Sequence, residues 1–331
     1  MDYDFREDEL PDGDSQAERP SLETTLEILK SIEESPFPST LYYGLSGLTP
    51  ADISQVRDVW ETIDPYKRHV LLAELAEASE LNFELDYREL GFFALDDPDS
   101  TVRESAVELL WEDESLELMR RLMELAQWDE AAAVRAAATN ALGRFVLLGE
   151  YSEVPTAEAE RVQDVVVNIL TNENEEIDVR RRALEAISNS GHEIVESAIE
   201  EAYTSSEHKM RASALYAMGR DYDPDKWGEI VLREIGSDEP EMRYEAARSA
   251  GELELKEAVP GLGRIATEDE RDNKEVAIWS LGEIGGREAI RILSALVEDA
   301  EENGDDVLLE SIEDAIGNAS LVGDELNFDD L

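Results

Sequence analysis

The stretches RASALYAMG, residues 211–219, and RYEAARSAG, residues 243–251, share one pattern. A basic residue comes first, Ala follows at position +3, an apolar residue stands at position +7 and Gly at position +8. Positions −1, +3 and +7 lie on one stripe of an α-helix, because three or four residues make about one turn. The pattern therefore predicts a helix whose buried stripe holds small residues.

The same pattern recurs along the chain at nearly even spacing. The copies begin at Arg68, Arg103, Arg135, Arg180, Arg211, Arg243 and Lys274. The intervals between these starts are 35, 32, 45, 31, 32 and 31 residues. Units of this length stack on their neighbours, since one unit is too small to bury its own apolar face. The sequence predicts an all-α fold, a right-handed α-solenoid of about seven helix pairs.

Composition and spacing divide the chain into four parts. Residues 1–20 are rich in Pro, Gly, Ser and acids, and they are predicted to form a disordered acidic tail. Residues 21–48 are predicted to hold an N-terminal helix and an irregular connection, and residues 49–317 the solenoid. The 45-residue interval places an inserted surface loop near 145–158. Residues 318–331 are predicted to form an acidic C-terminal tail.

Charge and composition limit the classes of partner. The chain has 331 residues and no Cys, which excludes disulfides and cysteine chemistry. Lys and Arg number 29 against 81 Asp and Glu, a net charge of −52. Such a chain repels phosphates, so we expect no nucleic-acid binding. No apolar run reaches the ~18 residues of a membrane helix, and the acidic N-terminus does not resemble a signal peptide. We expect a cytoplasmic protein without membrane contact, whose acidity reflects either a salty cell interior or a basic partner.

The repeated positions have structural interpretations. Ala at position +3 suits helices packed ~8–10 Å apart. Gly at position +8 is interpreted as the left-handed residue that ends a helix. An acid stands four residues before the basic residue in most copies, at Asp99, Glu176, Glu207, Glu239 and Glu270. Such an acid caps its helix or pairs with Arg of its own or the adjacent repeat. The evenly spaced Arg residues are therefore predicted to join repeats and not to bind a ligand.

These residues resemble the HEAT-repeat superfamily of armadillo-like helical proteins, in particular the short repeats called phycobilisome-lyase HEAT-like. The best matches are residues 99–103 and 281–290, together with residues 257–262, which carry an early Pro as that family's outer helix does. The resemblance covers about residues 50–317. It implies a scaffold or adaptor, because most members bind proteins and a minority are enzymes.

The enzymatic members of that superfamily give little support for catalysis here. Deoxyhypusine hydroxylases hold two irons with several His-Glu pairs, whereas this chain has three His, and only His192-Glu193 forms such a pair. The sequence also contains no Walker loop, no nucleophile elbow and no zinc-protease motif. We therefore predict no catalytic residues, no metal site, no cofactor and no enzymatic activity. A bilin lyase or isomerase, acting on a linear tetrapyrrole, is the alternative.

Each predicted pair consists of an outer helix followed by an inner helix, which carries the repeated pattern. The candidate binding residues lie on the inner helices, opposite the buried stripe. They are Arg182, Tyr216, Arg220, Arg248 and Trp279, at positions +2, +5 and +9 of their repeats. In a HEAT-like stack that side lines the concave surface, and we expect Tyr216 and Trp279 to be exposed to solvent. Tyr, Trp and Arg often dominate protein interfaces. The sequence therefore predicts a protein-binding scaffold that uses this face, with another protein as its partner.

Overall fold

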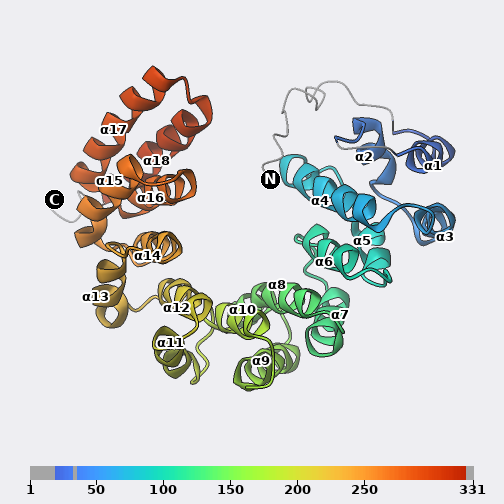
Figure 1. Ribbon diagram of the computed structural model, residues 1–331, viewed down its shortest axis with the longest axis horizontal. Helices are drawn as coiled ribbons and strands as arrows, with labels where there is room; N and C mark the ends of the chain where they lie inside the picture. The colour runs from blue at the N-terminus through green and yellow to red at the C-terminus, as the bar shows by residue number, and fades with distance from the viewer. Residues whose placement is uncertain (1–18, 33–35, 326–331) are drawn as a thin grey trace. The chain divides into compact units, whose positions relative to one another are not determined.

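The computed structural model describes residues 19–32 and 36–325, and these contain helices and no strand (Figure 1). The predicted all-α solenoid is confirmed. Its right-handedness stays a prediction. Residues 1–18 and 326–331, which hold most of the first predicted tail and the end of the second, lie outside the described residues.

The chain forms two compact units. Unit 1 reaches residue 145 and includes residues 157–165, and unit 2 holds the remainder. Unit 1 begins with α1 (Leu22–Lys30), α2 (Ser39–Leu45), α3 (Pro50–Trp60), α4 (Pro65–Leu81), α5 (Arg88–Ala94), α6 (Ser100–Leu109) and α7 (Leu116–Trp128). In this unit α4 packs against α6, and α5 packs against both α3 and α6.

Helices α8 (Ala132–Glu150) and α9 (Thr156–Thr171) fall at the boundary of the two units. They contain the extra residues of the 45-residue interval. We expected these residues to form a surface loop near 145–158. Instead, α8 continues to Glu150 and leaves a short connection of residues 151–155 before α9. The apolar residues Phe145 and Val146, both fully buried, explain the extension, because they continue the buried stripe of α8.

Unit 2 is a row of helix pairs. Its helices are α10 (Ile177–Ile187), α11 (Val195–Tyr203), α12 (His208–Arg220), α13 (Pro224–Glu234), α14 (Pro240–Glu252), the 3-10 turn η2 (Lys256–Ala258), α15 (Val259–Glu268), α16 (Arg271–Ile284), α17 (Gly286–Asn303) and α18 (Asp306–Glu325). The even-numbered helices pack on one another in order, and α12, α14, α16 and α18 each pack with the odd-numbered helix before them. Figure 1 shows α11, α13 and α15 on one side of this row, and no described helix of unit 2 covers the other side of α12, α14 and α16, which we call the free face.

The small residues of the repeat lie where inner helices meet. Ala214, Ala246 and Ala277, at position +3, are fully buried as the pattern predicts. Gly251, at position +8, is not a left-handed helix end, so that interpretation is wrong for this copy. It lies inside α14, where an added Cβ would be 2.9 Å from the Cα of Ser280 on α16. The hydroxyl of Ser280 also donates a hydrogen bond to the carbonyl of Ala247 at 2.8 Å. Close backbone approach therefore requires this glycine.

The left-handed residue comes three positions later in the repeat. Tyr222 and Glu254 have φ angles of 51°, and Gly285 has a φ angle of 64°. All three stand at position +11, directly after an inner helix has ended. A left-handed conformation costs a non-glycine residue about 1–2 kcal/mol. Two of the three repeats therefore keep a strained residue with a large side chain at this point.

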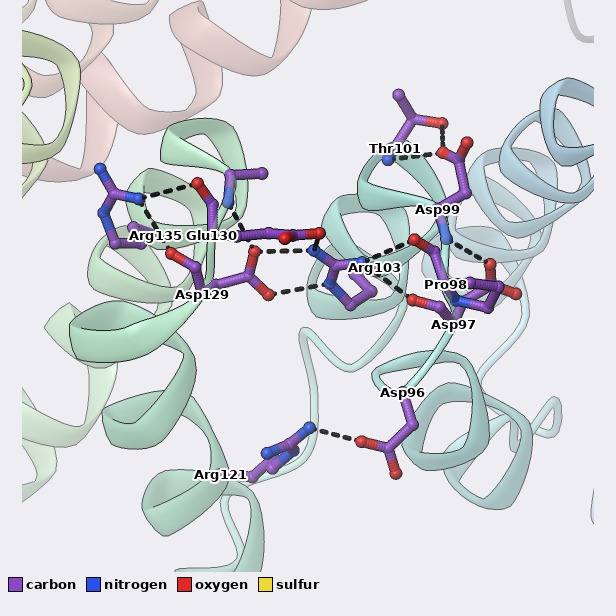
Figure 2. A network of polar contacts seen from close by, with 11 residues as sticks. Asp96, Asp97, Pro98, Asp99, Thr101, Arg103, Arg121, Asp129, Glu130 and Arg135 are labelled. Atoms are coloured by element: carbon purple, nitrogen blue, oxygen red, sulfur yellow. Dashed lines mark hydrogen bonds and ion pairs between the residues drawn. The ribbon is translucent and has the colours of Figure 1, made fainter.

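Three of the evenly spaced Arg residues, Arg68, Arg103 and Arg243, join repeats through an acid other than the predicted one. Arg180, in contrast, donates to the carbonyl of Leu170 in its own helix pair. Figure 2 shows Arg103 of α6, whose Nε and Nη2 each donate to Asp129 at 2.8 Å. Its Nη1 also donates to the carbonyl of Asp97 at 2.9 Å. Asp129 directly follows α7 and belongs to the next repeat. Arg243 and Asp269 repeat this bidentate pair, at 2.6 and 2.8 Å.

One of the five predicted acids at position −4 caps its own helix, and the other four do not. Asp99 caps α6 by accepting from the backbone N–H of Thr101. Glu176, Glu207, Glu239 and Glu270 precede their helices but accept no side-chain capping bond. Of these, Glu239 lies 3.7 Å from Arg211 of the preceding repeat. Asp is a preferred N-cap residue and Glu is not, because the extra methylene of Glu places its carboxylate away from the backbone N–H groups of the first turn.

Candidate functional site

The free face of unit 2 carries a stripe of large side chains on two adjacent inner helices. On α14 the stripe holds Tyr244, Arg248 and Glu252, at intervals of four residues. On α16 it holds Glu275, Trp279 and Glu283, again at intervals of four. Residues four apart lie above one another on a helix, so each set follows the helix axis. The two stripes form the walls of a groove.

A hollow of about 680 Å³ lies along this groove. It is lined by Arg220, Tyr222, Tyr244, Arg248, Gly251, Glu252, Glu254, Asp272, Glu275, Val276, Trp279 and Glu283. Tyr222 and Glu254, the strained left-handed residues at position +11, both contribute to its walls. Strain of this kind is often kept where a side chain has to point into a site. The hollow is therefore a candidate binding site. We name it the α14–α16 groove.

Trp279 is the exposed apolar surface of this groove. Its side chain is 39% exposed, as the sequence predicts, although the helix around it is mostly buried. No described cation stacks on its ring, whereas Tyr216 has two such neighbours. An exposed indole on a concave surface is a typical anchor for a protein partner.

Three of the other predicted residues form a side-chain cluster with Glu252 at one wall of the groove. Arg248 stacks on the ring of Tyr216 at 4.7 Å, and Arg220 stacks on it at 5.7 Å. Both guanidinium groups also face Glu252, with Nε–Oε1 distances of 3.2 and 3.3 Å. Tyr216 is thus half-buried and does not line the hollow, so its predicted exposure to solvent is wrong. This cluster holds the side chains of the wall in place, and the two Arg side chains occupy the ring faces of Tyr216.

Arg182 lies apart from the groove. Its Nη1 donates to Glu185 on its own helix α10 at 2.5 Å, and Ser213 of α12 donates to the same carboxylate at 2.5 Å. The buried Glu185 therefore links α10 to α12. The structure brings together Tyr216, Arg220, Arg248 and Trp279, and it does not bring Arg182 to them.

The sequence analysis missed Tyr244, Tyr222 and most of the carboxylates of the groove. Tyr244 and Glu275 stand at position +1 of their repeats, and position +1 lies one turn before position +5. A helical wheel that included this position would have found them. Tyr222 follows the end of α12, and its place depends on a left-handed turn that the helical period does not predict.

Glu245 is a half-buried acid of α14, and its Oε2 atom, which is itself buried, accepts no hydrogen bond from any described residue. Burial, strengthened by Glu185, Glu241 and Glu252 and opposed by Arg248, raises its pKa to about 7. Between pH 4.5, the ordinary pKa of a Glu, and about pH 7, the Glu245 carboxyl stays protonated in the folded protein but loses its proton in the unfolded chain. Stability attributable to this group is therefore fully present below pH 4.5 and is lost as the pH rises to about 7.

We expect Glu245→Gln to remove the loss of stability that Glu245 causes as the pH rises. The variant should match the parent in urea unfolding at pH 5 and exceed it at pH 8 by on the order of 2 kcal/mol. The exposed Glu229 on α13 offers the control Glu229→Gln, which should change neither value. An equal effect of Glu245→Gln at both pH values would contradict this account of the buried carboxyl.

Groups of three or more His, Cys, Asp or Glu that could hold a metal ion are not found in residues 19–32 and 36–325. None of the helices in this part of the chain has the length and apolarity to cross a membrane.

Comparison with known proteins identifies the repeat. The model of HEAT repeats matches residues 229–314, which span α13 to α18 and include the whole α14–α16 groove except its rim at Arg220 and Tyr222. The predicted HEAT resemblance is confirmed, whereas its phycobilisome-lyase subtype stays a prediction. No curated protein sequence is similar to this chain.

Several solved structures are similar at low identity. YibA of Escherichia coli is 16% identical, with 87% of this chain and 98% of that chain covered and a TM-score of 0.46. Human deoxyhypusine hydroxylase is 18% identical, with 80% and 95% covered and a TM-score of 0.36. Yeast importin-beta is 13% identical, with 89% and 46% covered and a TM-score of 0.42. These likenesses are too distant to indicate a function.

One prediction needs correction. We expected this chain not to be an enzyme, but an enzyme, human deoxyhypusine hydroxylase, is among the similar structures. The expectation of a non-enzyme therefore does not stand. The bilin lyase or isomerase alternative stays a prediction, which co-expression with a bilin and an absorbance spectrum would test.

Proposed function

We propose that this HEAT-repeat chain is a scaffold that binds a partner protein in the α14–α16 groove. The observation that carries the proposal is Trp279, an exposed indole beside a hollow of about 680 Å³ on the free face of the inner helices. Arg220 and Arg248 fix one wall through Glu252, so the groove is preorganised. Preorganised walls lower the entropic cost of binding.

The size of the groove fits a docking site and not a whole interface. A stable protein–protein contact buries about 800 Å² on each partner. The partner would therefore extend beyond the hollow over the free face of α12, whose last residue is Arg220. The net charge of −52 favours a protein partner over a nucleic acid, because a phosphate backbone would be repelled.

Photo-crosslinking tests this proposal. Tyr222, 62% exposed at the rim of the groove, and Tyr151, 68% exposed between α8 and α9, are a matched pair of tyrosines. Each would be replaced by the photoreactive amino acid benzoylphenylalanine, and the purified variants would be irradiated in extract of the source cells. We expect a discrete protein adduct from position 222 and none of the same mass from position 151.

The adduct should disappear when Trp279→Ala is added to the variant at position 222, because the anchor is then lost. Identical adducts from positions 222 and 151, or an adduct at 222 that Trp279→Ala leaves unchanged, would show that the groove is not the docking site.

A further inference from the structure

The charged groups that line the α14–α16 groove are not balanced. Five carboxylates, of Glu252, Glu254, Asp272, Glu275 and Glu283, face two guanidinium groups, of Arg220 and Arg248. Both guanidinium groups lie against Glu252 and stack on Tyr216, so they are not available to an incoming anion. The groove therefore presents net negative charge to a ligand.

Most of the remaining carboxylates have no cation of their own. Glu275 pairs with Arg271. Glu254, Asp272 and Glu283 form no ion pair with any residue that the structure describes. The buried Glu252, whose side chain is 7% exposed, also keeps an Oε2 that receives no hydrogen bond from the described residues. Carboxylates that line one groove repel one another, and a bound cation would relieve that repulsion.

Two aromatic rings of the groove, of Trp279 and Tyr244, also have no cation stacked on them among the described residues. Described cations stack on Tyr216 and on several rings elsewhere, but none stacks on Trp279 or Tyr244. The face of an indole attracts Lys and Arg side chains, and their aliphatic stems cover its apolar surface. An exposed Trp between unpaired carboxylates therefore selects a long cationic side chain over an anionic or purely apolar one.

The spacing along α16 sets the length of the occupant. Asp272 and Glu283 stand eleven residues apart on α16, with Trp279 between them. A helix rises about 1.5 Å per residue, so the two carboxylates are separated by roughly 16 Å along the helix axis. An extended peptide rises about 3.3 Å per residue and turns alternate side chains to one side, so three alternate side chains span about 13 Å. The long stems of Lys and Arg cover the remaining distance.

We propose that the α14–α16 groove binds an extended basic segment of a partner protein. Lys or Arg side chains at alternate positions of the segment face Asp272, Trp279 and Glu283 in turn. Glu254 and Tyr244 flank the central side chain from the other wall, and Arg220 and Arg248 act as positioning residues that hold Glu252. This inference rests on the proposed function and names the chemistry of the partner.

The test uses the full chain and a fluorescein-labelled peptide with three arginines at alternate positions and serine between them. The comparison peptide carries citrulline at the same positions, which keeps the shape and removes the charge. In fluorescence anisotropy at 0.1 M salt, where screening acts beyond about 10 Å, we expect the arginine peptide to bind and the citrulline peptide not to bind.

Two charge-matched double variants separate the groove from the overall acidity of the chain. Asp272→Asn/Glu283→Gln removes two groove carboxylates, and Glu298→Gln/Glu302→Gln removes two exposed carboxylates of α17. We expect the first variant and Trp279→Ala each to weaken binding by about tenfold and the α17 variant to bind like the parent.

Three results would overturn the inference: equal weakening by both double variants, equal binding of the two peptides, or binding of spermidine at the groove without binding of the arginine peptide. Failure here is distinguishable from failure of the proposed function. A partner without a basic segment would still form the adduct from position 222, whereas the arginine peptide would not bind.

Discussion

The variant Gly251→Ala is expected to be less stable than the parent by about 1–3 kcal/mol, the usual cost of overpacking a tight contact. The added Cβ would be 2.9 Å from the Cα and Oγ of Ser280. Since the Cα belongs to the backbone of α16, a change of side-chain rotamer cannot relieve the contact. The inner helices α14 and α16 would have to move apart, which also weakens the hydrogen bond from Ser280 to the carbonyl of Ala247.

The chain offers a matched control for this effect. Gly317 lies within α18, and an added Cβ there meets no described atom within 4 Å. Ala is favoured over Gly in a helix by about 0.8–1 kcal/mol, so Gly317→Ala should be more stable than the parent. Urea unfolding followed by far-UV circular dichroism would compare the two midpoints. Midpoints that shift in the same direction would contradict close packing of the inner helices at Gly251.

The variant Asp129→Ala is expected to lower the free energy of unfolding by about 3 kcal/mol, because it leaves a buried cation without its partner. Arg103 and Asp129 have side chains that are 9% and 6% exposed and share two hydrogen bonds. Burial acts to raise the pKa of Asp129, but the hydrogen bonds from Arg103 and the Ala131 N–H outweigh it and leave the pKa below its ordinary value. The carboxylate is therefore strongly held in the folded chain.

An exposed ion pair in the same unit provides the control. Glu124 on α7 pairs with Arg121 at 3.0 Å, and its side chain is 65% exposed. Exposed pairs contribute little, so Glu124→Ala should change stability by less than about 0.5 kcal/mol. The same urea measurement applies. If both variants unfold at the same urea concentration, the Arg103–Asp129 pair does not join the repeats in the way we describe.

The sequence predicted the repeat because the repeat depends on small buried residues that recur in register. The sequence alone identifies the buried positions of Ala214, Ala246 and Ala277, since each belongs to the face of a single helix. The partners of Arg103 and Arg243 were missed because Asp129 and Asp269 lie 26 residues further along, in the turn of the next repeat. Helical spacing within one segment does not predict a pair that crosses between repeats.

The candidate site was predicted in part for the same reason. The helical wheel placed Arg248 and Trp279 on the free face, and the structure agrees. A helical wheel could not show that Arg248 contacts both Glu252 and Tyr216, because two different helices contribute to this cluster. Gly251 was assigned to a helix end, since a sequence shows that a glycine is present but not which backbone approaches it.

The most direct test of a cation-binding groove at Trp279 is the indole N–H spectrum of the five Trp residues during titration with the arginine peptide. Trp279→Phe assigns the signal of interest, and Trp128, 79% exposed on α7, reports binding that is not specific to the groove. We predict that the Trp279 signal shifts with added peptide while the Trp128 signal stays in place. A stationary Trp279 signal, or equal shifts of both, would contradict the account.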